Sequence, residues 1–145
     1  MTDKISRFNN RYFFLSNFHP VRITVENVEY SSVEHAYQAS KTLSLPDRII
    51  ISKLPTSGQA KRYGRSVSIR PGWDKLKVDV MLSLLRQKFS NSTLRAMLLN
   101  TEEAELIEEN WWGDNFWGVY DGYGENMLGK LLMKVRKEIR ETTGG

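Results

Sequence analysis

The sequence of residues 22–41 is RITVENVEYSSVEHAYQASK, and it changes from a strand-like pattern to a helical one. Arg22–Val25 and Val28–Tyr30 are rich in β-branched and aromatic residues, which favour strands. The two runs flank Glu26-Asn27, a pair typical of a turn. We therefore predict a short β-hairpin in this stretch.

A helix is expected to start at Ser31–Glu34, which has the S-x-x-E form of a capping box, and to run to about Leu43. Beyond it, Ile49–Ile51 fits either a short helix or a strand, and periodicity alone does not decide. Amphipathic spacing and N-capping residues predict further helices over 73–89, 91–99, 101–109 and from Asn126 onward, where Asn126 would be the N-cap.

Helices thus dominate the expected fold, with the hairpin and a second small β element through Trp117–Tyr120. A chain of 145 residues is long enough for one hydrophobic core. It has no internal repeat, low-complexity tract or Gly/Ser-rich linker that would mark a boundary. We predict an α+β fold, predominantly helical, in a single domain over residues 1–145.

The composition excludes several kinds of site. Cysteine is absent, so disulfides, thiol nucleophiles and thiolate zinc sites are ruled out. The histidines are His19 and His35 alone, and we expect no metal requirement and no cofactor. No apolar run approaches the ~18 residues of a membrane helix, and the first ten residues are polar, so we expect a cytoplasmic protein. A net charge of +4 favours anionic partners without distinguishing a nucleic acid from a phosphate ester.

An acid, an amide and an ammonium group share one face of the first predicted helix. Glu34, Gln38 and Lys41 are spaced i, i+4, i+7, so this stripe could line a polar cleft. The same spacing also fits a solvated face on which Glu34 serves only as the acid of the capping box. Spacing alone does not choose between these interpretations.

Cationic residues are concentrated between residues 61 and 77, among glycines and a proline expected in loops. Arginine grips phosphate with two parallel hydrogen bonds and lysine supplies a compact charge, so we predict a phosphate-binding segment. Ordinary surface charge is the alternative. Trp73 fits either a cap on the core or a platform for a base. The cations are Lys61, Arg62, Arg65, Arg70, Lys75 and Lys77.

Three tryptophans and an acid are crowded into residues 111–118, WWGDNFWG. A core needs large apolar groups but does not need an Asp among them, so Asp114 is a candidate functional acid. Indole faces stack on nucleobases, with ~1–3 kcal/mol per base in nucleic-acid complexes. Trp117 is therefore expected to border a ligand.

A series of short motifs runs in order along nearly the whole chain. Residues 12–20 read YFFLSNFHP and residues 32–41 read SVEHAYQASK. Further blocks are Gly64-Arg65, Trp73-Asp74-x-x-Lys77, Lys88-Phe89, Asp114-x-x-Trp117-Gly118 and Gly124-x-Asn126-x-Leu128-Gly129. Together these blocks resemble the YbiA-like, or NADAR, family, and so many ordered matches are far more specific than any one of them.

The resemblance implies a mostly helical α+β fold and a hydrolase that cleaves N-glycosidic bonds of ribosyl compounds. Members of the family are associated with two substrates. One is a phosphoribosylamino-pyrimidine intermediate of riboflavin biosynthesis, and the other is ADP-ribose attached to guanine, which would make ADP-ribosylated nucleic acid a partner. The motifs do not separate these substrates, and they leave the oligomeric state open.

The resemblance also implies site residues. Its two acids carry over to Glu34 and Asp114, and its Schiff-base lysine carries over to Lys41 or Lys77. The sequence departs from the family pattern at Tyr30-Ser31-Ser32, where an aromatic residue followed by Pro-Thr is expected. This departure lies where the predicted helix begins. Positions expected around the ligand are Asn17, Trp73, Lys77, Trp117, Gly118 and Asn126, and phosphate is assigned to Arg65 with Arg62 or Lys61.

Two other functions use the same residues. A non-catalytic module could bind ADP-ribose or a nucleotide through the aromatic and basic groups without cleaving it. A basic nucleic-acid-binding protein is supported by the charge of +4 and opposed by the acidic run Glu102–Glu109. The presence of both Glu34 and Asp114 favours catalysis.

Overall fold

The structure is a computed structural model that describes residues 3–143 of the chain. Its contacts gather in two compact units. The central unit is Asn17–Lys88, and the terminal unit combines Met1–Ser16 with Phe89–Gly145. A single domain over residues 1–145 stays a prediction.

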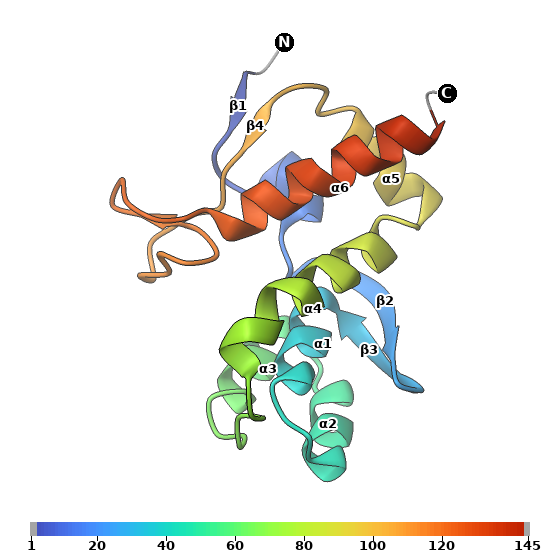
Figure 1. Cartoon of the computed structure of the whole chain (residues 1–145), viewed down its shortest axis with the longest axis vertical. Helices are drawn as coiled ribbons and strands as arrows, with labels where there is room; N and C mark the ends of the chain where they lie inside the picture. The colour runs from blue at the N-terminus through green and yellow to red at the C-terminus, as the bar shows by residue number, and fades with distance from the viewer. Residues whose placement is uncertain (1–2, 144–145) are drawn as a thin grey trace. The chain divides into compact units, whose positions relative to one another are not determined.

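The central unit starts with the expected β-hairpin (Figure 1). β2 (Pro20–Val25) and β3 (Val28–Ser32) pair in antiparallel orientation. Glu26 and Asn27 connect them with φ values of 49° and 69°. Two consecutive positive φ angles are what a two-residue turn of type I′ requires, because its twist matches that of the strands. The hairpin prediction is confirmed.

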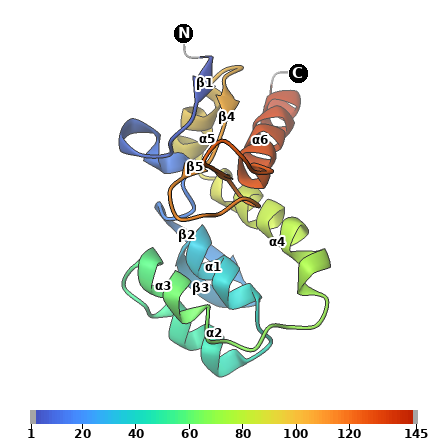
Figure 2. The ribbon, with the colours of Figure 1, turned by 90° about the vertical axis from the view of Figure 1, so that its left-hand side faces the viewer.

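Helix α1 (Val33–Ser40) follows β3 directly and lies at the centre of this unit, as Figure 2 shows. It packs against both strands of the hairpin and against α2 (Leu45–Ser52), α3 (Ser57–Tyr63) and α4 (Trp73–Lys88). All of its residues are buried, including the polar ones. Polar groups on such a helix must find partners within the protein or bind a ligand, because water does not reach them.

Two helices of the central unit bear on the predictions: α2 decides between two alternatives, and α3 was not predicted. Ile49–Ile51 lies in α2, so the helical alternative for this triplet is correct. Helix α3 is absent from the predictions, although its start carries a capping box. The Thr56 hydroxyl accepts from the Gln59 N–H at 3.1 Å, and the Gln59 amide oxygen accepts from the Thr56 N–H at 3.0 Å. The T-x-x-Q pattern was a usable signal for this helix.

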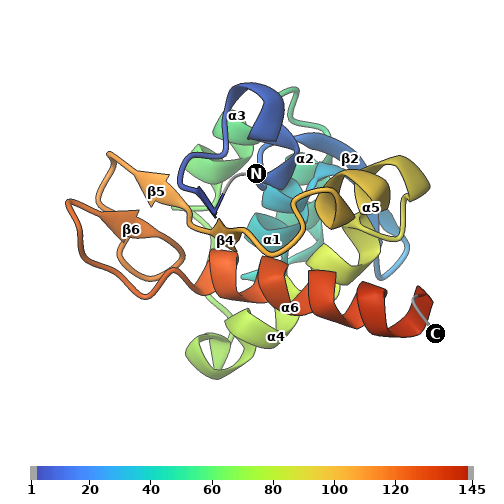
Figure 3. The ribbon, with the colours of Figure 1, turned by 90° about the horizontal axis from the view of Figure 1, so that it is seen from above.

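The strands of the terminal unit are short and come from distant parts of the sequence. β1 (Lys4–Ile5) pairs in parallel with β4 (Glu105–Leu106). β5 (Glu109–Asn110) pairs in parallel with β6 (Val119–Tyr120), which lies within the β element expected around residues 117–120. Figure 3 shows β5 and β6 in the loops that precede the last helix.

Helices supply the core of the terminal unit. They are the 3-10 helix η1 (Asn10–Leu15), α5 (Ser92–Leu99) and α6 (Met127–Thr143). Asn91 caps α5 through its side-chain oxygen, which accepts from the Leu94 N–H at 3.0 Å, as the sequence indicated. The apolar positions of α6 are buried as their helical spacing requires: Leu128, Leu131, Leu132 and Val135.

The predicted helix over residues 101–109 is wrong. Glu102 has a positive φ of 55°, which interrupts a right-handed helix immediately after α5. The N–H groups of Glu105 and Ile107 instead donate to the carbonyls of Asp3 and Ile5, both at 2.9 Å. Pairing with a remote strand has overridden the local helix propensity of the acidic run.

The fold class is α+β and predominantly helical, as predicted. Helices account for most of the ordered structure, and the strands pair only two at a time among residues 3–143. Within the same range, no helix is both long and apolar enough to span a membrane.

Candidate functional site

Glu34 is buried near the start of α1, with 8% of its surface exposed. The N-cap of the helix is Ser32, whose hydroxyl accepts from the His35 N–H at 3.1 Å, so Glu34 does not occupy the third helical position. The predicted capping box at Ser31–Glu34 is therefore wrong. Instead, Oε2 of Glu34 accepts a hydrogen bond from Nε2 of Gln38 at 2.6 Å.

The stripe Glu34, Gln38 and Lys41 is not a solvated helix face. Glu34 and Gln38 are buried, and Lys41, the residue that follows α1, is half-buried. The interpretation of Glu34 as only a surface capping acid is thereby contradicted. A carboxylate kept inside a protein needs polar neighbours or a function.

Two buried amide oxygens beside this stripe accept no hydrogen bond from residues 3–143: Oε1 of Gln38 and Oδ1 of Asn17. Gln38 packs so closely on Gly64 that a Cβ there would collide with its amide group. The carbonyl of Asn17 accepts from the Glu34 N–H at 3.0 Å, which ties Asn17 to the start of α1. Buried acceptors without donors are rare in native proteins, and they are suited to a ligand that brings N–H or O–H groups.

Cations gather around Lys41. Burial lowers the pKa of Lys41, Glu34 raises it, and the positive charges of Lys61, Arg65 and Lys77 lower it further. Lys61, Arg65 and Lys77 are therefore each close enough to act on Lys41. That they bind phosphate stays a prediction. Nζ of Lys77 also lies 3.5 Å from Oδ1 of Asp74.

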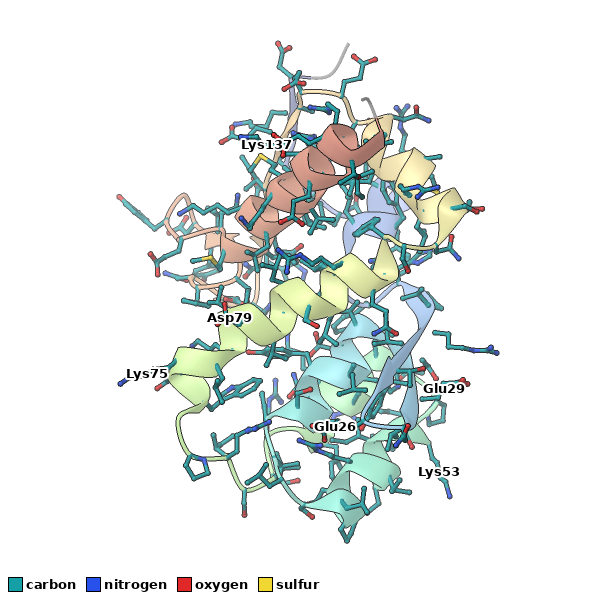
Figure 4. The ribbon with its side chains drawn as sticks, turned by 45° about the vertical axis from the view of Figure 1, so that its right-hand side comes forward. Glu26, Glu29, Lys53, Lys75, Asp79 and Lys137 are labelled. Atoms are coloured by element: carbon teal, nitrogen blue, oxygen red, sulfur yellow. The ribbon has the colours of Figure 1, made fainter. Side chains whose placement is uncertain are left out.

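The cationic segment is less loop-like than predicted. Lys61 and Arg62 lie in α3, and Lys75 and Lys77 lie in α4, so only the part between these helices is a loop. Arg62 and Lys75 are exposed, and Figure 4 shows Lys75 projecting from α4. Arg70 is tied to the end of α1, where its N–H donates to the Lys41 carbonyl at 2.7 Å.

Trp73 is buried at the first position of α4, and its ring centroid lies 5.4 Å from that of Tyr37. This environment supports the interpretation of Trp73 as a cap on the core, while a ligand contact stays a prediction. His35 has a structural place, since its ring nitrogens lie 2.7 Å from the Ser32 hydroxyl and 2.9 Å from the Leu54 carbonyl.

Lys88 is a buried cation that the sequence reasoning missed. It is fully buried at the last position of α4, and burial lowers its pKa to about 7. Lys88 also acts on His19. Burial lowers the pKa of His19, and the positive charge of Lys88 lowers it further. A signal was available: Lys88 follows Met81, Leu84 and Leu85 at i+7, i+4 and i+3, and therefore falls on the apolar face of the helix.

Asp114 lies in the terminal unit and shapes the loop that holds it. Its Oδ1 accepts from the N–H groups of Phe116 at 3.0 Å and Trp117 at 2.9 Å. The Asn110 side chain bonds the backbone N–H and carbonyl of Asp114 at 3.0 and 2.8 Å. Within residues 3–143, both of the hydrogen bonds that the Asp114 carboxylate accepts end on Oδ1 and none ends on Oδ2. The acid is thus held in place by one oxygen only.

Asn126 and Gly118 both contact the Leu106–Glu108 segment of the terminal unit. Oδ1 of Asn126 accepts from the Glu108 N–H at 2.9 Å, and its Nδ2 donates to the Leu106 carbonyl at 2.9 Å. Its side chain therefore bonds another segment rather than capping α6 as predicted. Gly118 lies so close to the Glu108 carbonyl that a Cβ would collide with it. Trp117 is half-buried, with its ring 4.9 Å from that of Phe116.

The predicted site residues are divided between the two units. The central unit contains Asn17, Glu34, Lys41, Arg62, Arg65, Trp73 and Lys77, and the terminal unit contains Asp114, Trp117, Gly118 and Asn126. Within the central unit, the structure brings Glu34, Lys41, Arg65 and Lys77 together. No group of three or more His, Cys, Asp or Glu side chains suited to a metal ion is found within residues 3–143.

Comparison with known proteins agrees with this fold. The solution NMR structure of Escherichia coli YbiA superposes with a TM-score of 0.85 at 36% identity, and the match covers 98% of this chain and 88% of that one. Residues 5–140 match the NADAR domain. The chain therefore belongs to the NADAR family.

Curated relatives carry the names of N-glycosidases. The N-glycosidase YbiA of Escherichia coli strain K12 is 37% identical over 148 residues, which cover 96% of this chain and 91% of that protein. An N-glycosidase of Nostoc punctiforme is 38% identical over 136 residues, covering 89% and 86%. A riboflavin biosynthesis protein of Vibrio vulnificus is 39% identical over 134 residues, and this match spans 88% of the chain but only 36% of that protein.

Proposed function

We propose that this chain hydrolyses the N-glycosidic bond between a phosphorylated ribose and a base. The observation that carries the proposal is the buried Glu34, bonded to Gln38 and surrounded by cations suited to a phosphate. Membership of a family whose relatives are named N-glycosidases supports the same reaction class. An acid with cations suited to phosphate close by is what the hydrolysis of a phosphorylated glycoside requires.

Cleavage of a ribosyl N-glycosidic bond builds positive charge at the anomeric carbon. We assign Glu34 to this charge, because its anionic carboxylate stabilises an oxocarbenium ion and accepts a proton from the attacking water. Gln38 holds one oxygen of Glu34 and thereby fixes its direction. The unsatisfied oxygens of Gln38 and Asn17 are suited to the ribose hydroxyls, which are donors.

Asp114 is assigned to the departing base or to a ribose hydroxyl. Its Oδ1 is committed to the turn, so Oδ2 is the oxygen that can transfer a proton or accept a hydrogen bond. Release of the base requires protonation of its nitrogen, and a second acid divides this task from that of Glu34. The two acids can exchange these tasks without a change in the overall reaction.

Phosphate is assigned to Arg65 with Lys61, and the nucleophilic amine of a Schiff-base route is assigned to Lys41 rather than Lys77. A lysine acts as a nucleophile in its neutral form. Burial and the neighbouring cations lower the pKa of Lys41, whereas Lys77 is paired with Asp74. Lys41 would attack the aldehyde carbon of the ring-opened sugar, and loss of water would then form the imine.

Two leaving groups follow from the names of relatives and from the family resemblance. One is guanine carrying ADP-ribose, and the other is the ribosylaminopyrimidine phosphate of riboflavin biosynthesis. Relatives that are named riboflavin biosynthesis proteins support the second. Both substrates contain a phosphorylated ribose, so the site described above suits either of them.

Purified full-length chain should be incubated in parallel with a guanine-ADP-ribosylated oligonucleotide and with the ribosylaminopyrimidine phosphate. Mass spectrometry should detect free ADP-ribose from the first or ribose 5-phosphate from the second. Saturable binding of either compound without cleavage would instead support the non-catalytic module. If the fold is native by circular dichroism and both compounds remain intact, the proposal is wrong.

A further inference from the structure

A cavity of about 330 Å³ lies within the central unit, where the β-hairpin meets α4. The α4 residues that line it recur at helical spacing, so they form one face of that helix. The amide of Gln87 ties this face to β2, because it bonds the N–H and the carbonyl of Thr24 at 2.6 and 3.0 Å. Cavities of this size hold small organic ligands. The α4 residues are Leu76, Asp79, Val80, Ser83, Leu84 and Gln87.

This cavity is separate from the Glu34 site, although both belong to the central unit. Ser40 is the residue of α1 that lines it. Ser40 is at i+6 from Glu34 and at i+2 from Gln38, so its side chain falls outside their stripe. None of the residues that line the cavity has a role in the reaction proposed above.

Four charged side chains line the cavity, and two of them pair with each other. Nη1 of Arg48 lies 2.5 Å from Oε2 of Glu26. The other two are Arg70 and Asp79, the latter labelled on α4 in Figure 4. Within residues 3–143, neither of them forms an ion pair. The guanidinium of Arg70 donates one long hydrogen bond, at 3.5 Å, to the Ser40 carbonyl. One positive and one negative group at the same cavity are therefore left without a charged partner.

Two opposite charges that do not pair with each other suit a ligand that carries both signs. A guanidinium binds a carboxylate with two parallel hydrogen bonds, and a carboxylate accepts from an ammonium group. A purely anionic ligand would bring negative charge toward Asp79, and a purely cationic one would bring positive charge toward Arg70. Leu76, Val80 and Leu84 add apolar surface, and Leu76 is exposed, so an apolar group that covers it would bind favourably.

We propose that this cavity binds a free α-amino acid with an apolar side chain. Its carboxylate binds Arg70, its ammonium group binds Asp79, and its side chain packs on the apolar residues of α4. The bound amino acid lies near the end of α1, because the Arg70 N–H donates to the Lys41 carbonyl at 2.7 Å. Binding at this cavity does not depend on the reaction proposed above.

The test compares three probes that share a side chain and differ in charge. L-Leucine carries both charges, 3-methylbutylamine lacks the carboxylate, and 4-methylpentanoate lacks the ammonium group. In NMR titrations of the full-length chain, we expect L-leucine to bind about 5-fold more tightly than either analogue, because each analogue loses one partly exposed ion pair. The backbone amide signals of Arg70 and Asp79 should shift, and those of the terminal unit should not.

Two variants separate the two charges. Arg70→Gln should weaken L-leucine and 4-methylpentanoate about 5-fold and leave 3-methylbutylamine unchanged. Asp79→Asn should weaken L-leucine and 3-methylbutylamine by a similar factor and leave 4-methylpentanoate unchanged. The matched controls are Lys53→Gln and Glu29→Gln, which remove exposed charges outside the cavity, both labelled in Figure 4. They should change none of the three affinities.

Equal affinities for the three probes would overturn the inference, and so would the absence of any shift with L-leucine. Binding of L-leucine that neither Arg70→Gln nor Asp79→Asn weakens would overturn it as well. Circular dichroism should first show that each variant is folded. Asp79 is exposed on α4, so Asp79→Asn tests the ammonium contact even if Arg70→Gln does not fold.

Discussion

The central and terminal units differ in the partners of their buried amide side chains. In the central unit, Glu34, Gln38 and Lys88 are buried, and an oxygen of Gln38 lacks a donor within residues 3–143. In the terminal unit, the side chains of Asn110 and Asn126 are bonded to the backbone of neighbouring segments, while large indoles lie in solvent.

This difference separates two ways of building a site. A buried acceptor without a donor costs ~1–3 kcal/mol, so the central unit keeps polar groups that do not help it fold. Such groups are expected to act on a ligand. The amides of the terminal unit have complete backbone partners, so they are expected to stabilise the loops that carry Asp114 and the tryptophans. Substitutions in the two units should therefore affect different measurements.

Glu34→Gln should have the largest effect on activity with little effect on stability. The new amide oxygen can still accept from Gln38, so the free energy of unfolding should fall by less than ~1 kcal/mol. An amide neither accepts a proton at neutral pH nor stabilises an oxocarbenium ion by its charge. The turnover rate should fall at least ~100-fold, the low end for acid–base groups.

The matched control is Glu29→Gln, which removes an exposed carboxylate of β3 that pairs with Arg22 at 3.3 Å and is labelled in Figure 4. It should leave turnover unchanged. If Glu34→Gln turns over substrate nearly as fast as the unaltered chain, Glu34 is not a catalytic residue. The expectation that buried polar groups of the central unit act on a ligand would then be wrong as well.

Asn126→Ala should act on the fold of the terminal unit. It removes the partners of the Glu108 N–H and the Leu106 carbonyl, and it places Ala at a φ of 52°, which Asn tolerates better. We expect the free energy of unfolding in urea to fall by ~2–3 kcal/mol. Asn115→Ala, at an exposed position of the preceding loop, should change it by less than ~1 kcal/mol. Unchanged stability with weakened substrate binding would support a ligand contact for Asn126 instead.

Lys88→Met should remove a pH dependence of stability from the central unit. Burial lowers the pKa of Lys88 to about 7 in the folded chain, against 10.5 as the ordinary value. Between these two values the unfolded chain binds more protons, so stability rises with pH. From about pH 7 to about pH 9, the unaltered chain should gain ~2 kcal/mol relative to Lys88→Met.

The comparison for this experiment is Lys75→Met, which removes an exposed ammonium group from the same helix. Its stability should follow the pH dependence of the unaltered chain. A Lys88→Met variant whose stability also runs parallel to that of the unaltered chain would show that Lys88 keeps an ordinary pKa.

The sequence predicted the elements whose signals are local. The hairpin turn at Glu26-Asn27 and the amphipathic helices over 73–88, 92–99 and 127–143 all form nearly where expected. The run 101–109 failed because its backbone partners lie near residues 3–5, at a separation that a local pattern does not contain. The offset of one residue at the start of α1 also came from competition between two adjacent serines, of which Ser32 is the cap.

The site was predictable in its residue types but not in its environment. Spacing identified the stripe of Glu34, Gln38 and Lys41, and left open whether water or protein surrounds it. Burial depends on the hairpin and helices that pack around α1, which are tertiary contacts. The position of Asn126 was also identified, while its bonds to the Leu106–Glu108 segment required the folded chain.

The smallest expected effect distinguishes two exposed arginines of the central unit, Arg65 and Arg62. Arg65 is close enough to lower the pKa of Lys41, whereas Arg62 is not among the charges that act on it. If phosphate binds to Arg65 and Lys61, then Arg65→Ala should raise the KM for a phosphorylated substrate ~5–10-fold with little change in kcat. This corresponds to one exposed, salt-screened phosphate contact, which contributes about 1 kcal/mol.

The matched control is Arg62→Ala, which removes the same charge from the neighbouring helix and should change KM less than ~2-fold. The effect of Arg65→Ala on KM should also become smaller as salt is added, because salt screens the attraction between Arg65 and the phosphate. Equal KM values for the two variants would mean that the positive charge of this segment acts only as a general field, and the assignment of phosphate to Arg65 would be withdrawn.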